Sequence, residues 1–261
     1  MTGMFLACIW GFVVAPGLSW ASMVEGDLVR EARLRDEIVD MIFDGEPLML
    51  QAGEREFLSI LTEAEDAQIG VIILHGRGFH PDWQETVNPL RVGLADHGWT
   101  TLSLQMPVLE KSATYYDYVP VFDAAIPRID AGVAELRRRG LEHVVLIAHS
   151  CGAHMAMHWV DAGKGGAIDG YVGLGMGATD YRQYMAKPFP LERFTGPVLD
   201  VYGENDFPAV IKMAPERLSL IEQAGNAQSQ QMLLPGADHY YAKSGAALVE
   251  LVHRWLASIR F

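Results

Sequence analysis

Apolar and polar positions along this chain predict a series of alternating strands and helices. From residue 70 onward, short runs of consecutive apolar residues are separated by longer segments in which apolar residues recur every three or four positions. The first pattern is typical of strands buried on both faces of a sheet, and the second of helices that pack on that sheet. Strands are expected at 70–74, 99–104, 143–148, 170–175, 197–202 and 230–234, and helices at 86–97, 120–139, 151–162, 209–224 and 245–259.

This alternation predicts an α/β fold with a three-layer, doubly wound, mostly parallel sheet. Upstream, an amphipathic helix is expected at 27–43, within an N-terminal helical extension that spans 22–45 and packs on the domain. Two strands, at 48–51 and 56–63, should follow it. The connection from 176 to 196 is too short for a large cap domain, so we expect 22–261 to form a single domain.

The N-terminus has the pattern of a secretory signal. Its first charged residue is Glu25, and a continuous apolar run ends at Pro16 and is followed by small residues up to Ala21. We therefore expect residues 1–21 to be a signal peptide and the protein to be exported, periplasmic or secreted. No basic residue precedes the run, so an uncleaved membrane anchor and a buried N-terminal element are the alternatives. A bilayer span needs about 20 apolar residues, more than this run offers, so no stable membrane insertion is expected after cleavage.

Composition and charge exclude several classes of protein. The 33 acidic and 20 basic residues give a net charge of −13, which excludes non-specific binding to nucleic acid or anionic lipid as the main function. Arg137–Arg139 before Gly140 are typical of a helix C-terminus with a glycine cap, and a nucleic-acid patch is the alternative. Two cysteines exclude a disulfide scaffold and a cysteine-ligated zinc site. Cys8 would leave with the signal, so the mature chain could form no internal disulfide.

No cofactor and no metal are expected. No G-x-G-x-x-G sequence stands at a strand–helix turn, and the glycines from Gly173 to Gly177 lack the spacing of a nucleotide site. We interpret those glycines as close packing at the end of a strand. His154 and His158 share a helix face and could hold a metal, but without an H-E-x-x-H context they are better interpreted as packing residues.

A serine stands at a predicted junction between a strand and a helix. Ser150 follows the strand expected at 143–148 and precedes the helix expected at 151–162. The sequence from Ala148 to Gly152 matches the nucleophile-elbow pattern G-x-S-x-G, with alanine in place of the first glycine. Small residues flank the serine of such elbows because its backbone is strained and crowded. The alternative is that Ser150 only caps the helix, since serine is a favoured N-cap residue.

Two further loops supply the partners that a catalytic serine needs. A serine attacks at neutral pH only when a base accepts its proton and an acid orients that base. Asp206 and His239 each follow a predicted strand, so both lie with Ser150 at the carboxyl edge of the sheet. The chain order Ser150, Asp206, His239 is that of the α/β-hydrolase triad.

Other residues compete for these roles. Asp200 lies inside its predicted strand, and Asp180, after the preceding strand, is the second choice for the acid. Asp238 should point away if the next residue, His239, points in. Cys151 is a poor candidate for the nucleophile because the elbow aims Ser150. We interpret His149 as structural.

A fourth loop, from Leu74 to Gly78, could complete the site. The backbone amides of Arg77 and Gly78, with that of Cys151, are candidates for an oxyanion hole. The Arg77 side chain could also reach an anionic or polar group of a substrate. The remaining candidates for substrate binding are His75 and, in a loop at 108–119 that should form one wall, Tyr115 and Tyr116.

Through these motifs the chain resembles the α/β-hydrolase superfamily, in the form without a large cap domain. More narrowly, it resembles an uncharacterised group of exported bacterial proteins with this fold. The resemblance covers roughly residues 45 to 259, and its matching stretches are 80–83, 97–107, 197–203 and 235–239. It implies the fold and a location in the cell envelope, but no particular substrate.

The sequence therefore predicts a serine hydrolase that acts on a small-molecule carboxylic ester through Ser150, His239 and Asp206. Two alternatives remain: a non-catalytic binding or assembly protein of the cell envelope built on a hydrolase scaffold, and an amidase or peptidase with the same triad. A filled pocket, or a His239 out of reach of Ser150, would favour the first. Nothing in the sequence predicts the oligomeric state.

Overall fold

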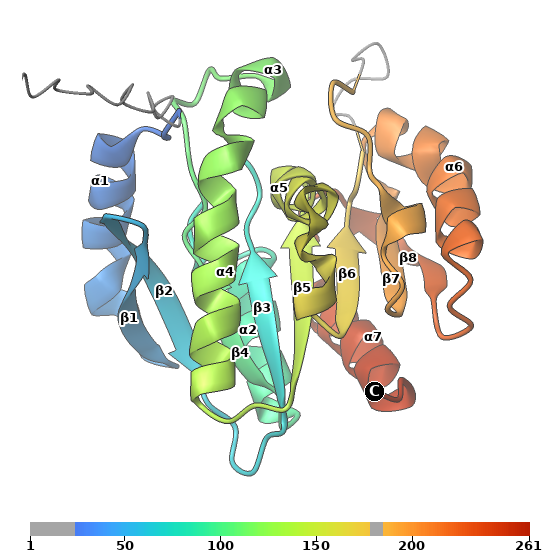
Figure 1. Ribbon diagram of the computed structural model, residues 1–261, viewed down its shortest axis with the longest axis horizontal. Coiled ribbons are helices and arrows are strands. Elements are labelled where there is room, and N and C mark those ends of the chain that lie inside the picture. Colours follow the sequence, from blue (N-terminus) through green and yellow to red (C-terminus); the bar gives the residue numbers. More distant parts are fainter. Residues whose placement is uncertain (1–23, 178–184) are drawn as a thin grey trace, which may run out of the picture.

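The computed structural model describes residues 24–177 and 185–261, which form an eight-stranded sheet with helices on both faces (Figure 1). The strand order is β1-β2-β4-β3-β5-β6-β7-β8. β1 and β2 form an antiparallel hairpin, β2 pairs antiparallel with β4, and all the remaining pairs are parallel. The strands are β1 (Glu46–Ala52), β2 (Arg55–Thr62), β3 (Ile69–Leu74), β4 (Thr100–Leu104), β5 (His143–His149), β6 (Gly170–Leu174), β7 (Val198–Asn205) and β8 (Gln230–Asp238). This arrangement confirms the predicted fold class.

The α-helices are α1 (Leu28–Ile38), α2 (Val87–Asp96), α3 (Tyr115–Tyr118), α4 (Phe122–Arg138), α5 (Cys151–Trp159), α6 (Pro208–Ala224) and α7 (Gly245–Ser258). All of them except α3 correspond to predicted helices. Gly140, just after α4, has a φ of 86°, the left-handed conformation expected of its cap. The loop predicted at 108–119 instead contains the short helix α3, which a capping box between Thr114 and Asp117 begins.

Alternate residues of the central strands supply the two halves of the core. Ile72 and Leu74 of β3 belong to the cluster that α4 and α5 cover, whereas Val71 and Ile73 belong to the cluster that α2 and α7 cover. Figure 1 shows α4, α5 and α6 in front of the sheet and α7 behind it. Burial on both faces explains why these strands are continuous apolar runs in the sequence.

β7 and β8 extend beyond the ranges that the sequence predicts. Their pairing continues past an irregularity at Gly203 to the pair Asn205 and Asp238. The backbones approach so closely there that a Cβ on Gly203 would lie 2.4 Å from the Ala237 carbonyl oxygen. The residues around Gly203 and Gly236 have the composition of a loop, so sequence periodicity ends these strands too early. The extension carries the chain up to Asp206 and His239.

The predicted N-terminal helical extension packs beside the β1–β2 hairpin, as Figure 1 shows. α1 is shorter than predicted, and a 3₁₀ turn, Val39–Met41, follows it. The buried Glu31 of α1 pairs with Arg128 of α4 at 2.9 Å. The backbone N–H of Asp27 donates to the Val108 carbonyl oxygen at 2.7 Å. These contacts attach α1 to the loop after β4 and to α4.

Two sequence-based predictions fall on residues that the structure does not describe. The predicted signal peptide, 1–21, and Asp180 both lie outside the described residues, so export and the role of Asp180 stay predictions. Within the described residues, no helix combines the length and the apolar character that a membrane span requires.

A buried ion pair joins β7 to α6. Asp200 and Arg217 are both at most 1% exposed, and the carboxylate accepts from Arg217 Nε at 2.8 Å. Gln231 donates to the same carboxylate oxygen at 2.7 Å, and Arg217 Nη1 donates to the Val210 carbonyl oxygen at 2.9 Å. Asp200 thus holds the two elements together through Oδ2, whereas its Oδ1 is buried without a hydrogen-bond partner.

We expect Asp200→Ala to lower the free energy of unfolding by about 3–5 kcal/mol, because it leaves the Arg217 charge buried without its partner. Urea unfolding followed by circular dichroism measures this change. The matched control is Asp161→Ala, which removes an exposed ion pair with Arg193 and should cost less than about 1 kcal/mol. Equal losses in the two variants would contradict this account of the buried pair.

Candidate active site

Ser150 occupies a sharp turn between β5 and α5. Its backbone has φ 51° and ψ −116°, a left-handed conformation that is unfavourable for any residue with a Cβ. Two backbone hydrogen bonds hold it: Ser150 N–H donates to the Leu174 carbonyl oxygen, and Ala153 N–H donates to the Ser150 carbonyl oxygen, each at 2.9 Å. Its side chain makes no capping hydrogen bond to α5, so the alternative reading of Ser150 as a helix cap is wrong.

The turn requires a glycine two residues after the serine. A Cβ on Gly152 would lie 2.6 Å from the carbonyl oxygen of His75, because the first turn of α5 passes directly over the end of β3. Ala148, in place of the first glycine of the pattern, is fully buried and packs into the core. The second small position of the elbow is therefore imposed by a backbone contact, whereas the first has room for a methyl group.

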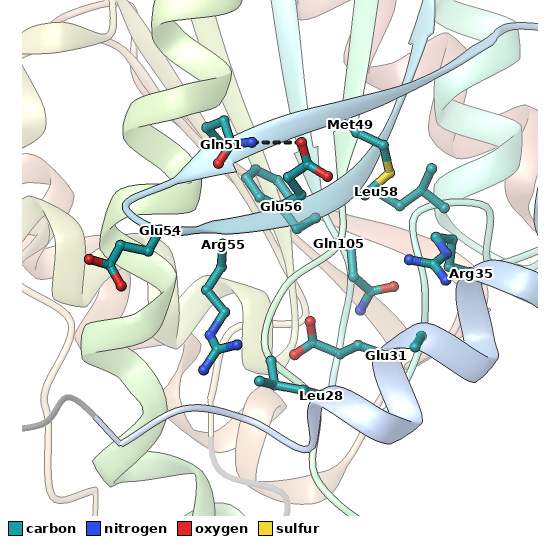
Figure 2. A pocket seen from close by; sticks show the side chains of 12 residues that line it. Leu28, Glu31, Arg35, Met49, Gln51, Glu54, Arg55, Glu56, Leu58 and Gln105 are labelled. Atoms are coloured by element: carbon teal, nitrogen blue, oxygen red, sulfur yellow. Dashed lines mark hydrogen bonds between the residues drawn. The ribbon is translucent and has the colours of Figure 1, made fainter.

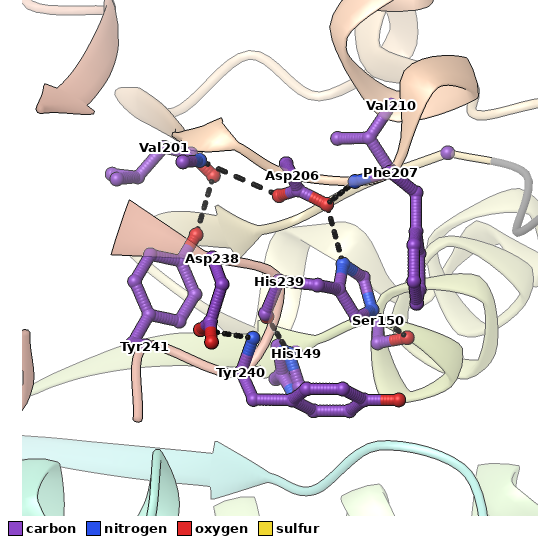
Figure 3. Close-up of polar contacts among 12 residues, drawn as sticks. His149, Ser150, Val201, Asp206, Phe207, Val210, Asp238, His239, Tyr240 and Tyr241 are labelled. Carbon is purple, nitrogen blue, oxygen red and sulfur yellow. Dashed lines mark hydrogen bonds and ion pairs between the residues drawn. The ribbon is translucent and has the colours of Figure 1, made fainter. Parts of the chain in front are cut away.

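The side chains of Ser150, His239 and Asp206 form a continuous hydrogen-bonded chain (Figure 3). His239 Nδ1 lies 2.6 Å from Asp206 Oδ1, and His239 Nε2 lies 2.8 Å from Ser150 Oγ. A carboxylate only accepts, so Nδ1 carries the proton, and Nε2 of the neutral ring then accepts from the serine hydroxyl. This is the arrangement in which the imidazole can take the serine proton.

Backbone hydrogen bonds fix the orientation of the Asp206 carboxylate independently of His239. Asp206 Oδ1 also accepts from the Phe207 backbone N–H at 2.7 Å, and Oδ2 accepts from the Gly203 N–H at 3.4 Å. The residue is 5% exposed, so its negative charge acts on His239 with little screening by water.

The rival acids have other partners. Asp200 pairs with Arg217, as described above. Asp238 Oδ1 accepts from the backbone N–H groups of Tyr240 and Ala242, so this carboxylate closes the turn after β8 and is exposed.

His149 supports the site from below, in line with its predicted structural role. His149 Nε2 lies 2.9 Å from the carbonyl oxygen of His239 and donates to it. Burial lowers the pKa of His149 to about 3, so the ring is neutral and keeps this hydrogen bond across the physiological range. A Cβ on Gly76 would lie 3.0 Å from His149 Nδ1, which explains the glycine there.

The loop after β3 forms the other side of the site. Residues Gly76 to Phe79 make a tight turn in which Phe79 N–H reaches the Gly76 carbonyl oxygen and Gly78 has a φ of 76°. Arg77 in this turn and Cys151 at the start of α5 both line the pocket at Ser150, whereas Gly78 does not. Cys151 is the first residue of α5, where backbone N–H groups have no partner within the helix. Of the three predicted oxyanion donors, two thus belong to residues at the pocket.

Two predicted substrate contacts lie elsewhere. His75 is 1% exposed and outside the pocket lining: its Nδ1 lies 2.7 Å from the Gly76 carbonyl oxygen, and its Nε2 accepts from the Met106 N–H at 2.9 Å. It supports the turn from below because both ring nitrogens bond to backbone groups. Tyr116 is 51% exposed and also outside the lining, whereas its neighbour Tyr115 lines the pocket. The two rings pack edge to face with a centroid distance of 5.3 Å, and only that of Tyr115 reaches the pocket.

The pocket at Ser150 is small, about 70 Å³. It is lined by Arg77, Phe79, Tyr115, Ser150, Cys151, His154, Phe207, His239 and Tyr240. Four of these residues, Phe79, His154, Phe207 and Tyr240, are not among the predicted site residues. Phe207 and Tyr240 directly follow Asp206 and His239, so their adjacency to the triad candidates was a usable signal. The Phe207 ring packs on His239 with a centroid distance of 4.1 Å.

The glycines and histidines weighed for cofactor or metal binding have packing roles. A Cβ on Gly175 would lie 3.0 Å from the His239 ring, and one on Gly173 would meet Met176, which confirms the predicted close packing. His154 Nε2 lies 3.2 Å from the Gly177 carbonyl oxygen, whereas His158 Nε2 lies 2.7 Å from Asp123. Among the described residues, no three His, Cys, Asp or Glu side chains gather as metal ligands would.

Comparison with known sequences gives one family and no individual relative. Residues 42–125 match the model of a family described as a protein of unknown function, DUF3530. No curated protein matches the sequence significantly. The matched segment runs from before β1 into α4, so it includes the turn at Arg77 but not Ser150, Asp206 or His239.

Solved structures resemble the whole fold at low sequence identity. An esterase from Pyrococcus furiosus is 16% identical with a TM-score of 0.66, over 84% of this chain and 92% of that one. A dienelactone hydrolase from Anabaena variabilis is 18% identical with a TM-score of 0.65, over 82% of this chain and 98% of that one. A member of the α/β serine hydrolases without a lid, from Xanthomonas campestris, is 15% identical with a TM-score of 0.62, over 83% and 95%. The described part of the chain thus has the α/β-hydrolase fold without a lid, as the resemblance in its motifs predicted. Over residues 42–125 the chain matches a family of unknown function.

Proposed function

We propose that this protein is a serine hydrolase that cleaves carboxylic esters. The observation that carries the proposal is the hydrogen-bonded chain from Asp206 through His239 to Ser150, with distances of 2.6 and 2.8 Å, at the edge of a pocket. A working base and nucleophile are separated by about 2.6–3.2 Å. The non-catalytic alternative expects a filled pocket or a histidine out of reach, and neither agrees with this geometry.

In the acylation step, Ser150 Oγ forms a bond to the ester carbonyl carbon while its proton passes to His239 Nε2. The carbonyl π electrons move onto the oxygen, and the backbone N–H groups of Arg77 and Cys151 donate to it. When the tetrahedral intermediate collapses, the bond to the alcohol oxygen breaks. The imidazolium returns its proton to that oxygen, which leaves as an alcohol.

Deacylation repeats this sequence with water. His239 Nε2 takes one proton from the water as its oxygen bonds to the acyl carbon, and the intermediate expels Ser150 Oγ, which regains a proton. Asp206 stays ionised throughout, and its charge stabilises the imidazolium formed in each step. The ester preference is supported by structural relatives named as esterases, and cleavage of amides by the same residues is the alternative.

We expect a fluorophosphonate to form a single covalent adduct on Ser150, detected by intact mass. Ser150→Ala should abolish the adduct. Asp206→Asn should slow labelling by roughly 10³–10⁴-fold, because an amide favours the wrong tautomer of His239. The matched control is Asp238→Asn at the exposed last residue of β8, which keeps an acceptor for its turn and should label at the wild-type rate.

Absence of an adduct on folded wild-type protein would count against the hydrolase and favour the binding or assembly protein. An adduct that persists in Ser150→Ala would place the nucleophile elsewhere. Circular dichroism of each variant shows whether the fold is retained.

Cys151 should be unreactive although it adjoins Ser150. Burial raises the pKa of its thiol to about 12, so at pH 8 roughly one thiol in 10⁴ is ionised, and the residue is 7% exposed. We expect iodoacetamide at pH 8 to leave Cys151 unmodified in the native protein and to modify it after unfolding in urea, as read by peptide mapping. Rapid alkylation in the native state would reopen the assignment of the nucleophile.

Ester hydrolysis should decline in acid because a protonated His239 cannot accept the serine proton. Burial lowers the pKa of His75 and His149 to about 3 and that of His154 to about 4, so these neighbours stay neutral above pH 5. A fall in kcat/KM as the pH is lowered therefore does not come from these three rings and is assigned to His239. The measurement needs an ester without a titrating group, and a flat profile from pH 5 to 9 would contradict the mechanism.

A further inference from the structure

A long groove adjoins the pocket at Ser150. It has a volume of about 790 Å³ and runs between α1 and the turn after β3. Arg77, Phe79 and Tyr240 line both the pocket and the groove, so the two are continuous at these residues. The small pocket can hold only a short group, and the adjoining groove offers space for the larger part of an ester bound at Ser150.

The groove carries positive charge that the protein does not neutralise. Arg77 and Lys111 are exposed at its wall and have no ion pair with any described carboxylate. Arg30 of α1 is nine-tenths buried and donates from Nη2 to the Gly78 carbonyl oxygen at 3.2 Å. It too has no carboxylate partner among the described residues, and its Nε has no hydrogen-bond acceptor. A buried guanidinium in this state is costly unless an anion reaches it.

The acidic residues of the groove do not cancel this charge. Glu37 lies 3.7 Å from Arg33, and these two exposed groups neutralise each other. Glu110 is then one carboxylate against Arg30, Arg77 and Lys111. An excess of cations in a cleft of a chain with net charge −13 attracts anions to this place in particular.

The cavity on the other side of α1 provides a contrast (Figure 2). It has about 410 Å³ between α1 and the β1–β2 hairpin, and its two arginines are both paired with carboxylates. Glu31 pairs with Arg128, Arg35 with Asp36, and Arg55 with Glu25 at 2.8 Å. The unpaired cations are therefore a property of the groove beside Ser150 and not of α1 in general.

Aromatic side chains form the floor of the groove. The rings of Phe79 and Trp83 are stacked with a centroid distance of 3.9 Å, and Tyr240 meets Phe79 edge-on at 5.9 Å. Trp83 Nε1 is buried and has no hydrogen-bond partner. A flat apolar body can lie on such a surface while a charged group on it reaches the arginines.

We propose that the groove binds a carboxylate on the larger part of the substrate, so that the preferred esters are anionic and carry an aromatic or apolar body. Arg77 and Arg30 would hold the carboxylate, with Lys111 contributing charge at the entrance. A guanidinium suits this ligand because its parallel N–H groups match the two carboxylate oxygens. This inference rests on the proposed ester hydrolysis, whose nucleophile it uses.

Hydrolysis of matched ester pairs tests the proposal. The carboxylate is placed on the alcohol part in 4-acetoxybenzoate, against neutral 4-acetoxybenzamide, and on the acyl part in 4-methylumbelliferyl hemiglutarate, against the neutral valerate. We expect kcat/KM to favour the anionic member of at least one pair by about 10-fold or more at low salt. The preference should shrink as salt is added, because the groove is open to solvent.

Variants locate the preference in the groove. Three single variants are compared: Arg77→Gln, Arg30→Gln and Lys111→Gln. Each arginine variant should reduce the ratio of kcat/KM for the anionic ester to that for the neutral ester by about 10-fold. Lys111→Gln should reduce it less. We use this ratio because a disturbance of the turn that carries the Arg77 amide would change kcat/KM for both esters alike and would cancel. Arg193→Gln, an exposed arginine paired with Asp161, is the control and should leave the ratio unchanged.

Equal rates for both members of each pair, or a preference for the neutral esters, would overturn the proposal, as would a preference that survives all three groove variants. If neutral acetates are cleaved and the fluorophosphonate adduct forms, such a result rejects the groove and leaves the hydrolase intact. If no ester is cleaved, calorimetry on the Ser150→Ala protein tests binding directly. Tighter binding of 4-hydroxybenzoate than of 4-hydroxybenzamide, with the difference lost when Arg77→Gln is added, supports the carboxylate site. Equal binding of the two compounds overturns it.

Discussion

The left-handed backbone at Ser150 is the constraint on which the rest of the site depends. A residue with a Cβ holds this conformation only where its surroundings fix it. Here the fixing contacts are the hydrogen bond from Ser150 N–H to Leu174 and the passage of Gly152 over the His75 carbonyl oxygen. Both need β3, β5 and β6 to be in register at their carboxyl ends. The sheet therefore does more than support the serine, because it maintains the strain that aims the side chain at His239.

Most of the fold could be predicted because its core strands are buried on both faces, and a continuous apolar run such as 144–148 has few other interpretations. The ends of β7 and β8 could not, because Gly203 and Gly236 look like loop residues and their pairing depends on a contact between distant segments. α3 was missed for a different reason. It is held by one local capping box, which is a weak signal inside a segment without periodicity.

The residues of the candidate site were likewise predictable in part. Ser150, Asp206 and His239 each stand just after a strand, so local sequence was enough to bring them to one edge of the sheet. His75 is a predicted substrate contact, but its ring bonds to the backbone of Gly76 and of Met106, and the contact with Met106 is distant in sequence. The packing of Phe79 on Trp83 likewise depends on tertiary structure, as does the unpaired state of Arg30.

Helix α1 contacts the candidate site although it supplies none of the reacting groups. It lies outside the alternating strand–helix framework, yet Arg30 contacts the carbonyl of Gly78, next to a residue of the pocket wall. Changes in this helix can alter what approaches the serine without touching the strained turn or the core strands. Exposed positions of α1 along the groove can therefore change while the reacting groups stay fixed, whereas the buried Glu31 is held by its ion pair with Arg128.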